Sequence, residues 1–216
     1  MSDKQIQVFI QAGGRSSRMG VDKAWLEING QPMIEHVLAA ARPVADGLSI
    51  VIHPANPNAA RYSELAASRQ ARLLNDLHDH QGPLGGIYTA LANCRAGEAA
   101  LILACDVPFL TTEFLEFLCR KHRARAPQVT VPLCADGRLQ PLAAIYDQSC
   151  LAAVEEKLAR QELKVGRLFD AVRSELIDFQ EFAHLPGASK FFLNLNTMAE
   201  YRSAAPDSPT GESGAC

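Results

Sequence analysis

The chain has 216 residues and a mass of 23.4 kDa, and 48% of its residues are hydrophobic, which is enough apolar material for one large domain with a substantial core. Its net charge of −3 and its pI of about 6.1 argue against binding of nucleic acid through a broad basic face. The first residues lack the pattern of a signal peptide and no stretch is apolar enough to cross a bilayer, so we expect a cytoplasmic protein without a membrane partner.

The first expected element is an apolar strand at residues 5–10, and it runs directly into a glycine-rich turn. Two glycines and three cations follow the strand: Gly13, Gly14, Arg15, Arg18 and Lys23. Glycine has no Cβ, so the backbone of such a turn can bring its N–H groups close to an anion. The spacing fits neither the Walker A loop nor the dinucleotide-binding fingerprint. The pattern therefore predicts a different kind of polyphosphate-binding loop.

The chain then alternates between apolar strands and helices. Strands are predicted at 48–53, 72–75 and 99–105, and helices at 32–41, 58–67, 84–93 and 111–123. Thr111 or Thr112 can cap the start of the last of these helices. Strands that are apolar throughout, with helices between them, are typical of a mainly parallel sheet covered on both faces.

Beyond Pro127 the pattern changes to two strands, at 129–133 and 139–146, around a polar turn at 135–138, with a helix near 149–160. The predicted fold class is therefore α/β, with a Rossmann-like, mainly parallel but mixed sheet and helices on both faces. We expect residues 1–202 to form one domain. Residues 203–216 are small, polar and rich in proline and glycine, so we expect them to be a disordered tail.

Asp106 comes directly after the apolar strand at 99–105. In open α/β sheets ligands collect at the carboxyl ends of the strands, where the glycine-rich turn also lies. Magnesium prefers oxygen ligands and typically takes one or two carboxylates together with phosphate oxygens, so Asp106 is a candidate magnesium ligand. A plain turn-capping role for Asp106 before Pro108 stays open.

Other chemistry has no candidate in the sequence. The six cysteines are scattered, with no Cys-x-x-Cys pair and no histidine at zinc spacing, which indicates reduced thiols and no structural metal site. No Ser, His and Asp arrangement around a nucleophile turn is present. His78 and His80 lie in a polar loop and are given no role.

Four segments resemble the molybdenum cofactor guanylyltransferases, a MobA-like branch of the sugar-phosphate-type nucleotidyltransferases: AGGRSSRMGVDKAWLEINGQPMIEHV, GPLGG, ACDVPFL and FFLNLNTMAEY. The resemblance runs from about Val8 to Tyr201. It implies transfer of GMP from GTP to the phosphate of molybdopterin, with release of pyrophosphate. It also implies Mg²⁺ as the cofactor, and apoenzymes or their chaperones as possible receivers of the product.

The resemblance also assigns the site residues. Catalytic roles fall on Arg15, Arg18, Lys23 and Asp106, with Asp106 as the metal ligand. Nucleotide binding falls on Gln11, Ala12, Gly13, Gly14, Lys23, His53, Asp76 and Asp106, with backbone N–H groups at 12–14 holding base and phosphates. Binding of the pterin substrate falls on Gly82, Pro83, Leu84, Gly85, Gln140, Asn194 and Asn196.

Some positions keep a second interpretation or depart from the family. Gln140 precedes Pro141 and could equally be an exposed residue of an edge strand, because proline favours edges. FFLNLNTMAEY is expected to form a strand that ends in two carboxamides before a helix, and Asn196 could equally be a plain cap of that helix. Gln11 stands where the family usually has leucine, and His53 where it often has asparagine.

Two alternatives to the guanylyltransferase remain. One is a cytidylyltransferase acting on the same pterin, or a nucleotidyltransferase acting on a sugar or polyol phosphate. Relatives that use CTP more often begin the loop with AAG, so the AGG of this chain favours guanine, although Gln11 weakens that inference. The other is a non-catalytic module that holds nucleotide or delivers the cofactor.

Overall fold

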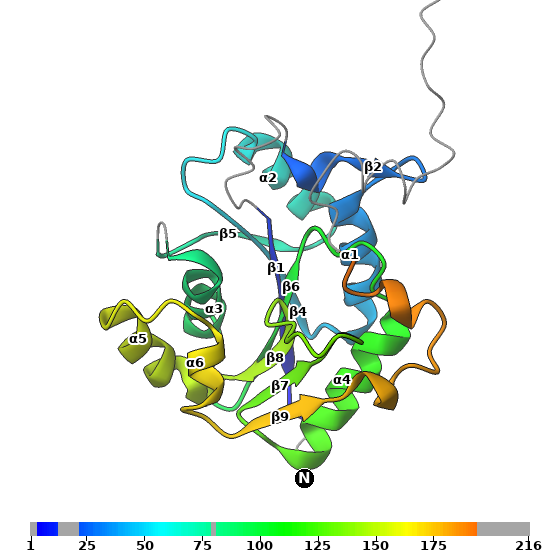
Figure 1. The fold of residues 1–216 in the computed structure, drawn as a ribbon. Helices are drawn as coiled ribbons and strands as arrows, with labels where there is room; N and C mark the ends of the chain where they lie inside the picture. The colour runs from blue at the N-terminus through cyan, green and yellow to red at the C-terminus, as the bar shows by residue number, and fades with distance from the viewer. Residues whose placement is uncertain (1–3, 13–21, 79–80, 194–216) are drawn as a thin grey trace, which may run out of the picture.

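The computed structural model describes residues 4–12, 22–78 and 81–193. A seven-stranded sheet with the order β5-β4-β1-β6-β8-β7-β9 lies at its centre (Figure 1). The strands are β1 Ile6–Gln11, β4 Gly47–Ile52, β5 Arg72–Asn75, β6 Ala99–Ala104, β7 Val129–Pro132, β8 Ala143–Asp147 and β9 Ser174–Ile177. β5, β4, β1 and β6 are parallel, β8 is antiparallel to both β6 and β7, and β9 is parallel to β7. The expected mixed, mainly parallel sheet is confirmed.

Helices cover both faces of this sheet, with α3, α5 and α6 on one side and α1 and α4 on the other (Figure 1). The helices are α1 Met33–Ala41, α2 Ala59–Ser68, α3 Gly82–Ala92, α4 Thr112–Arg125, α5 Leu151–Ala159 and α6 Gly166–Phe169. Short 3₁₀ turns are η1 Lys23–Trp25, η2 Arg42–Val44, η3 Gln148–Cys150, η4 Phe179–Glu181 and η5 Ala188–Lys190. A small hairpin joins β2 Glu27–Ile28 to β3 Gln31–Pro32. Every helix in the described part of the chain is too short or too polar to span a bilayer.

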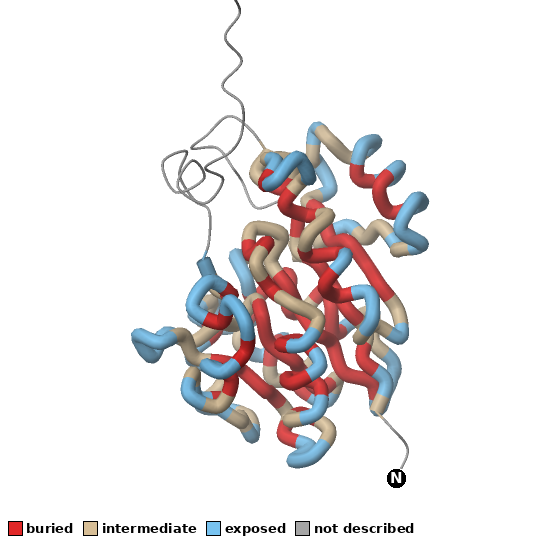
Figure 2. Tube along the Cα trace, turned by 90° about the vertical axis from the view of Figure 1, so that its right-hand side faces the viewer, coloured by how far each residue is buried: buried red, intermediate tan, exposed pale blue. Residues whose placement is uncertain are grey.

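The central strands are mostly apolar because each one contributes to two cores. In β1, Ile6, Val8 and Ile10 belong to the cluster under α1 and α4, whereas Phe9 belongs to the cluster under α3 and α5. Successive side chains of a strand point to opposite faces, so a sheet buried on both sides favours apolar residues at most positions. Gln7 and Gln11 are the polar exceptions in β1. Figure 2 shows this as continuous buried segments through the middle of the molecule.

Most expected elements are found within one or two residues of their predicted bounds. Thr111 caps α4, because its hydroxyl accepts a hydrogen bond from the Phe114 N–H at 3.3 Å. The five cysteines in the described ranges are free thiols, as expected: Cys94, Cys105, Cys119, Cys134 and Cys150.

Two of the expected strands are wrong in part. The strand predicted at 139–146 starts only at Ala143, since Pro141 has no N–H to give to a sheet ladder. Gln140 therefore lies in a loop and not in an edge strand. Phe191 and its two following residues form a turn after η5 and not a strand, because Phe191 is buried against the ring of Phe114, with 4.8 Å between ring centroids. The short elements α6 and β9 were not predicted.

His122 is a buried polar residue in the core between α4 and β7. Its Nδ1 lies 3.0 Å from the Thr130 hydroxyl, and its Nε2 is buried without a partner in the described part of the chain. Burial, together with the nearby positive charges of Lys4 and Arg123, lowers the pKa of His122 from 6.5 to about 4. The imidazole is therefore neutral in the folded protein at neutral pH.

This histidine predicts an acid-sensitive component of stability. As the pH falls below 6.5, His122 becomes protonated in the unfolded chain. In the folded protein it stays neutral until the pH reaches about 4. Over that window the wild type should lose on the order of 3 kcal/mol relative to His122→Gln. Chemical denaturation across the pH range measures the difference. His184→Gln, at an exposed position, is the control and should follow the wild type at every pH; parallel curves for the wild type and His122→Gln would contradict the prediction.

Candidate functional site

The candidate site lies where the parallel strands end. β4 and β5 lie on one side of β1 and β6 on the other, so the chain order reverses at β1. Ligand crevices of open α/β sheets form at the carboxyl ends of strands at such a reversal. The end of β1 is fixed from both sides, because the Ala12 N–H donates to the Val51 carbonyl at 2.8 Å and the Cys105 N–H donates to the Gln11 carbonyl at 3.1 Å.

This pairing corrects one expectation. The N–H of Ala12 was expected to hold a nucleotide, but it continues the β1–β4 ladder by one residue and is already engaged. The glycine-rich turn starts at the next residue. Its predicted site residues lie outside the described ranges: Gly13, Gly14, Arg15 and Arg18.

Lys23 and Asp106 are brought together at this edge from separate parts of the chain. Lys23 opens η1, and Asp106 follows the end of β6. Burial raises the pKa of the Asp106 carboxyl, and the positive charge of Lys23 together with a backbone hydrogen bond acts in the opposite direction. The pair therefore places one cation and one half-buried carboxylate at the same strand ends.

The neighbouring thiol of Cys105 is not a nucleophile. Burial raises its pKa above the usual range, and the negative charges of Asp106 and Asp22 raise it further. The thiol therefore stays protonated at neutral pH, and protonated thiols are weak nucleophiles. This agrees with the absence of a covalent-catalysis pattern in the sequence.

Asp22 fixes the turn that carries Lys23. Its Oδ2 accepts hydrogen bonds from the Tyr62 hydroxyl at 2.8 Å and from the Asn58 amide at 3.2 Å, both on or beside α2. Its Oδ1 accepts from the Ala24 N–H at 3.2 Å and caps η1. One carboxylate thus ties the residues on both sides of Lys23 to α2.

Aromatic contacts reinforce this connection. The rings of Trp25 and Tyr62 lie 5.0 Å apart between centroids, and the Arg61 guanidinium lies 3.8 Å from the centre of the Trp25 ring. Asp22, Tyr62 and Trp25 were not among the site residues predicted from the sequence. An aspartate directly before a short helical turn is a capping signal that could have identified Asp22; nothing local points to Tyr62.

Asp76 lies at the end of β5 and faces α3. Its backbone N–H donates to the Ile52 carbonyl at 2.8 Å, and its Oδ1 lies 2.6 Å from the Thr89 hydroxyl and 3.2 Å from the His78 N–H. The Thr89 hydroxyl also accepts from the Leu77 N–H at 2.9 Å. One carboxylate oxygen of Asp76 therefore accepts hydrogen bonds from both α3 and the loop that leads to it.

The GPLGG segment forms the first turns of α3. Gly82 has a φ of +59°, which favours glycine, and Pro83 lies in the first turn, where a missing N–H costs nothing. A Cβ on Gly85 would lie 3.0 Å from the His78 carbonyl oxygen, so Gly85 is needed for close packing of the loop. Leu84 is fully buried in the core under α3, which leaves only its backbone to reach a ligand.

The other predicted site residues are distributed around the same edge. His53 follows β4, and its Nδ1 accepts from the Ala55 N–H at 3.0 Å. Gln140 lies near the end of β6, because the Leu142 carbonyl accepts from the Ala104 N–H at 2.9 Å, and its Nε2 lies 2.6 Å from the Cys134 sulfur. Asn194 and Asn196 lie outside the described ranges, as does the tail from residue 203.

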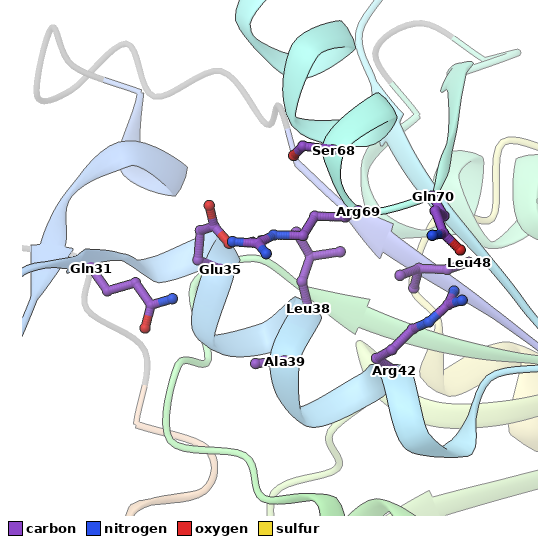
Figure 3. A pocket seen from close by; sticks show the side chains of 9 residues that line it. All are labelled: Gln31, Glu35, Leu38, Ala39, Arg42, Leu48, Ser68, Arg69 and Gln70. Carbon is purple, nitrogen blue, oxygen red and sulfur yellow. Dashed lines mark hydrogen bonds and ion pairs between the residues drawn. The ribbon is translucent and has the colours of Figure 1, made fainter.

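A cavity of about 380 Å³ lies elsewhere, between α1, the end of α2 and the start of β4 (Figure 3). Its lining residues are Gln31, Glu35, Leu38, Ala39, Arg42, Leu48, Ser68, Arg69 and Gln70. The Arg69 guanidinium points toward Glu35, with Nε 2.8 Å from its Oε2 (Figure 3). None of the predicted site residues lines this cavity.

Known proteins resemble this chain along most of its length. Residues 8–175 match the family model of the MobA-like NTP transferase domain. A curated relative from Carboxydothermus hydrogenoformans, named probable molybdenum cofactor guanylyltransferase, is 35% identical and the match covers 92% of this chain and 94% of the relative. The molybdenum cofactor guanylyltransferase of Vibrio cholerae is 30% identical, with 88% and 87% covered.

A solved structure shows the same fold. The molybdopterin-guanine dinucleotide biosynthesis protein A of Archaeoglobus fulgidus superposes with a TM-score of 0.77 at 22% identity, covering 93% of this chain and 97% of that one. A synthase from Anaerococcus prevotii, 4-diphosphocytidyl-2C-methyl-D-erythritol synthase, superposes with a TM-score of 0.69 at 15% identity, covering 94% and 96%.

The Asp22–Tyr62 bond predicts a local effect of Tyr62→Phe. This variant keeps the ring contact with Trp25 but removes a hydrogen bond to a charged group, so the free energy of unfolding should fall by about 2 kcal/mol. Backbone amides of residues 23–26 should exchange with deuterium faster than in the wild type, because η1 loses a tie to α2.

Tyr146→Phe is the matched control. It removes another buried tyrosine hydroxyl bond, to the Pro141 carbonyl at 2.8 Å, in the core on the other side of the sheet. Exchange at residues 23–26 should not respond to it. Equal exchange at η1 in the two variants would argue against the anchoring role of Asp22.

Proposed function

The chain belongs to the MobA-like NTP transferase family, and we propose on that basis that it is a molybdenum cofactor guanylyltransferase. It transfers GMP from GTP to the phosphate of molybdopterin and releases pyrophosphate. The observation that carries the proposal is the identity of 30–35% with curated guanylyltransferases over most of both chains. The described geometry agrees, since a cation and a carboxylate meet at the carboxyl ends of the central strands.

The chemistry needs no residue that attacks the substrate. An oxygen of the acceptor phosphate, ionised at neutral pH, forms a bond to the α-phosphorus of GTP, and the bond from that phosphorus to the bridging oxygen of pyrophosphate breaks. Catalysis of such a transfer depends on positioning and on stabilisation of charge. Lys23 supplies a positive charge at the strand ends, and the Asp22 network holds the turn from which it projects.

Asp106 fits a magnesium ligand. It offers carboxylate oxygens, the type of donor that magnesium prefers, at the carboxyl end of β6. Burial raises the pKa of its carboxyl, and the positive charge of Lys23 acts in the opposite direction. Asp106 would hold the magnesium ion, which would supply Lewis-acid stabilisation of the negative charge on the phosphates. Lys23 would add a second positive charge at the same strand ends.

The remaining roles are part of the proposal. Arg15 and Arg18 would contact the triphosphate, Asn194 and Asn196 the substrate phosphates, and Gln140 the pterin. The enzyme would hand its product to an apoenzyme or to that enzyme's chaperone in the cytoplasm. A cytidylyltransferase is the alternative. The solved structures of that kind which resemble this chain are less than 25% identical to it, so they support only the fold.

Product mass tests the reaction directly. Purified protein is mixed with magnesium, molybdopterin and equal amounts of GTP, CTP, ATP and UTP, and the pterin product is analysed by mass spectrometry. We expect a mass gain equal to one GMP and release of pyrophosphate. A gain equal to CMP would identify a cytidylyltransferase, and nucleotide binding without any product would identify a delivery module.

Two substitutions test the catalytic pair. Lys23→Ala should lower kcat by about 10²-fold with a smaller change in the KM for GTP, because its charge matters most in the transition state. Asp106→Asn should remove magnesium-dependent turnover.

The matched controls are Lys190→Ala and Asp136→Asn, at exposed positions outside the site. Both should retain wild-type kinetics. Equal losses in kcat and in GTP affinity would contradict the role of Lys23, and normal magnesium-dependent turnover of Asp106→Asn would contradict the metal assignment.

A further inference from the structure

Two glutamines on β1 occupy equivalent positions but differ in their partners. Gln7 and Gln11 lie on the same face of the strand, one near each end. The Gln7 Nε2 donates to Glu98 Oε1 at 3.2 Å. The Gln11 Nε2 is also buried, yet in the described part of the chain it has no hydrogen-bond partner. Of the two glutamines, the one at the carboxyl end of the strand has an amide nitrogen without a partner among the described residues.

The Gln11 carboxamide is seated against the backbone of α3. A Cβ on Gly86 would lie 2.3 Å from Nε2 and 2.5 Å from both Cδ and Oε1. These nearly equal distances mean that the plane of the amide faces the helix, and that only glycine at position 86 leaves room for it. The backbone of Gln11 is fixed on both sides of β1, so the side chain starts from a rigid point.

A complementary unsatisfied group lies at the start of the same helix. Gln81 precedes α3 and makes no side-chain cap, and its Oε1 is buried without a partner among the described residues. A Cβ on the adjacent Gly85 would lie 3.3 Å from the Gln81 Cβ. A donor and an acceptor are therefore both left unpaired around two consecutive glycines. Buried polar groups without partners are costly, and sites that bind ligands are where such groups occur.

We propose that these two carboxamides bind the lactam edge of a fused heterocycle, with Gln11 as the specificity-determining residue. The ring carbonyl accepts a hydrogen bond from Gln11 Nε2, and the adjacent ring N–H donates to Gln81 Oε1. Both groups are uncharged, which suits a neutral ring better than a phosphate. Guanine and pterin share this edge; naming these two rings rests on the proposed function, and the experiment distinguishes them.

Binding measurements test the role of Gln11. Titration calorimetry compares GTP with 2-aminopurine riboside triphosphate, which lacks the ring carbonyl. If the ring is guanine, the wild type should bind GTP about tenfold more tightly than the analogue, and Gln11→Leu should bind the two equally. If the ring is the pterin, Gln11→Leu should leave GTP affinity unchanged and raise the KM for molybdopterin about tenfold. If Gln11→Leu changes neither the GTP affinity nor the KM for molybdopterin, the proposal is overturned.

Gly86→Ala provides a second variant that leaves both glutamines in place. Its methyl group would displace the Gln11 carboxamide, so the variant should reproduce the loss seen with Gln11→Leu. The double variant should be no worse than either single one. If the losses of the two single variants add up in the double variant, Gly86→Ala does not act through the Gln11 carboxamide. That result would contradict the proposed position of the amide against α3.

Stability without ligand separates recognition from folding. Gln11→Leu should not lower the denaturation midpoint, because the removed amide nitrogen has no partner, whereas Gln7→Leu should lower it by depriving Glu98 of a donor. Equal destabilisation by the two would show that Gln11 serves the fold and would overturn the proposal. A wild type that forms no guanylated product, but whose nucleotide selectivity depends on Gln11, would refute the proposed function and support this inference.

Discussion

The site depends on how β1 is held between two parallel neighbours. Hydrogen bonds from Ala12 to Val51 and from Cys105 to Gln11 fix the last residues of the strand on both sides. Ala12 and Asp106 therefore lie directly after two strand ends that these bonds align. A loop can bind a triphosphate with a defined geometry only when its starting point does not move. The rigid sheet thus fixes the positions of site residues that lie in turns.

The contacts of η1 show how Lys23 is held in place. A short 3₁₀ turn has few internal hydrogen bonds, so it is held by its surroundings. Here the carboxylate of Asp22 and the ring of Trp25 join it to Tyr62 of α2. A change in α2 would therefore be felt at Lys23 without direct contact with a substrate.

Sequence patterns predicted the parallel half of the fold well, because strands buried on both faces and amphipathic helices give strong signals. Asp106 was a candidate because it follows a recognisable apolar strand, and Lys23 because it follows a recognisable glycine-rich pattern. The Asp22–Tyr62 bond joins residues far apart in the sequence, and no local pattern reveals it. The late start of β8 depended on the backbone of Pro141, and α6 and β9 are too short for periodicity to detect. The unpaired amide of Gln11 could be recognised only once Gly86 was placed beside it.

The sheet order also has a consequence for synthesis of the protein. β1 is made first but lies between β4 and β6, whose residues follow only at 47–52 and 99–104. β1 can pair with β4 early, but its other edge must stay unpaired until nearly half of the chain has left the ribosome. Long-range parallel pairing of this kind folds slowly and exposes strand edges to aggregation. Chaperone dependence during production should therefore be greatest before β6 is complete.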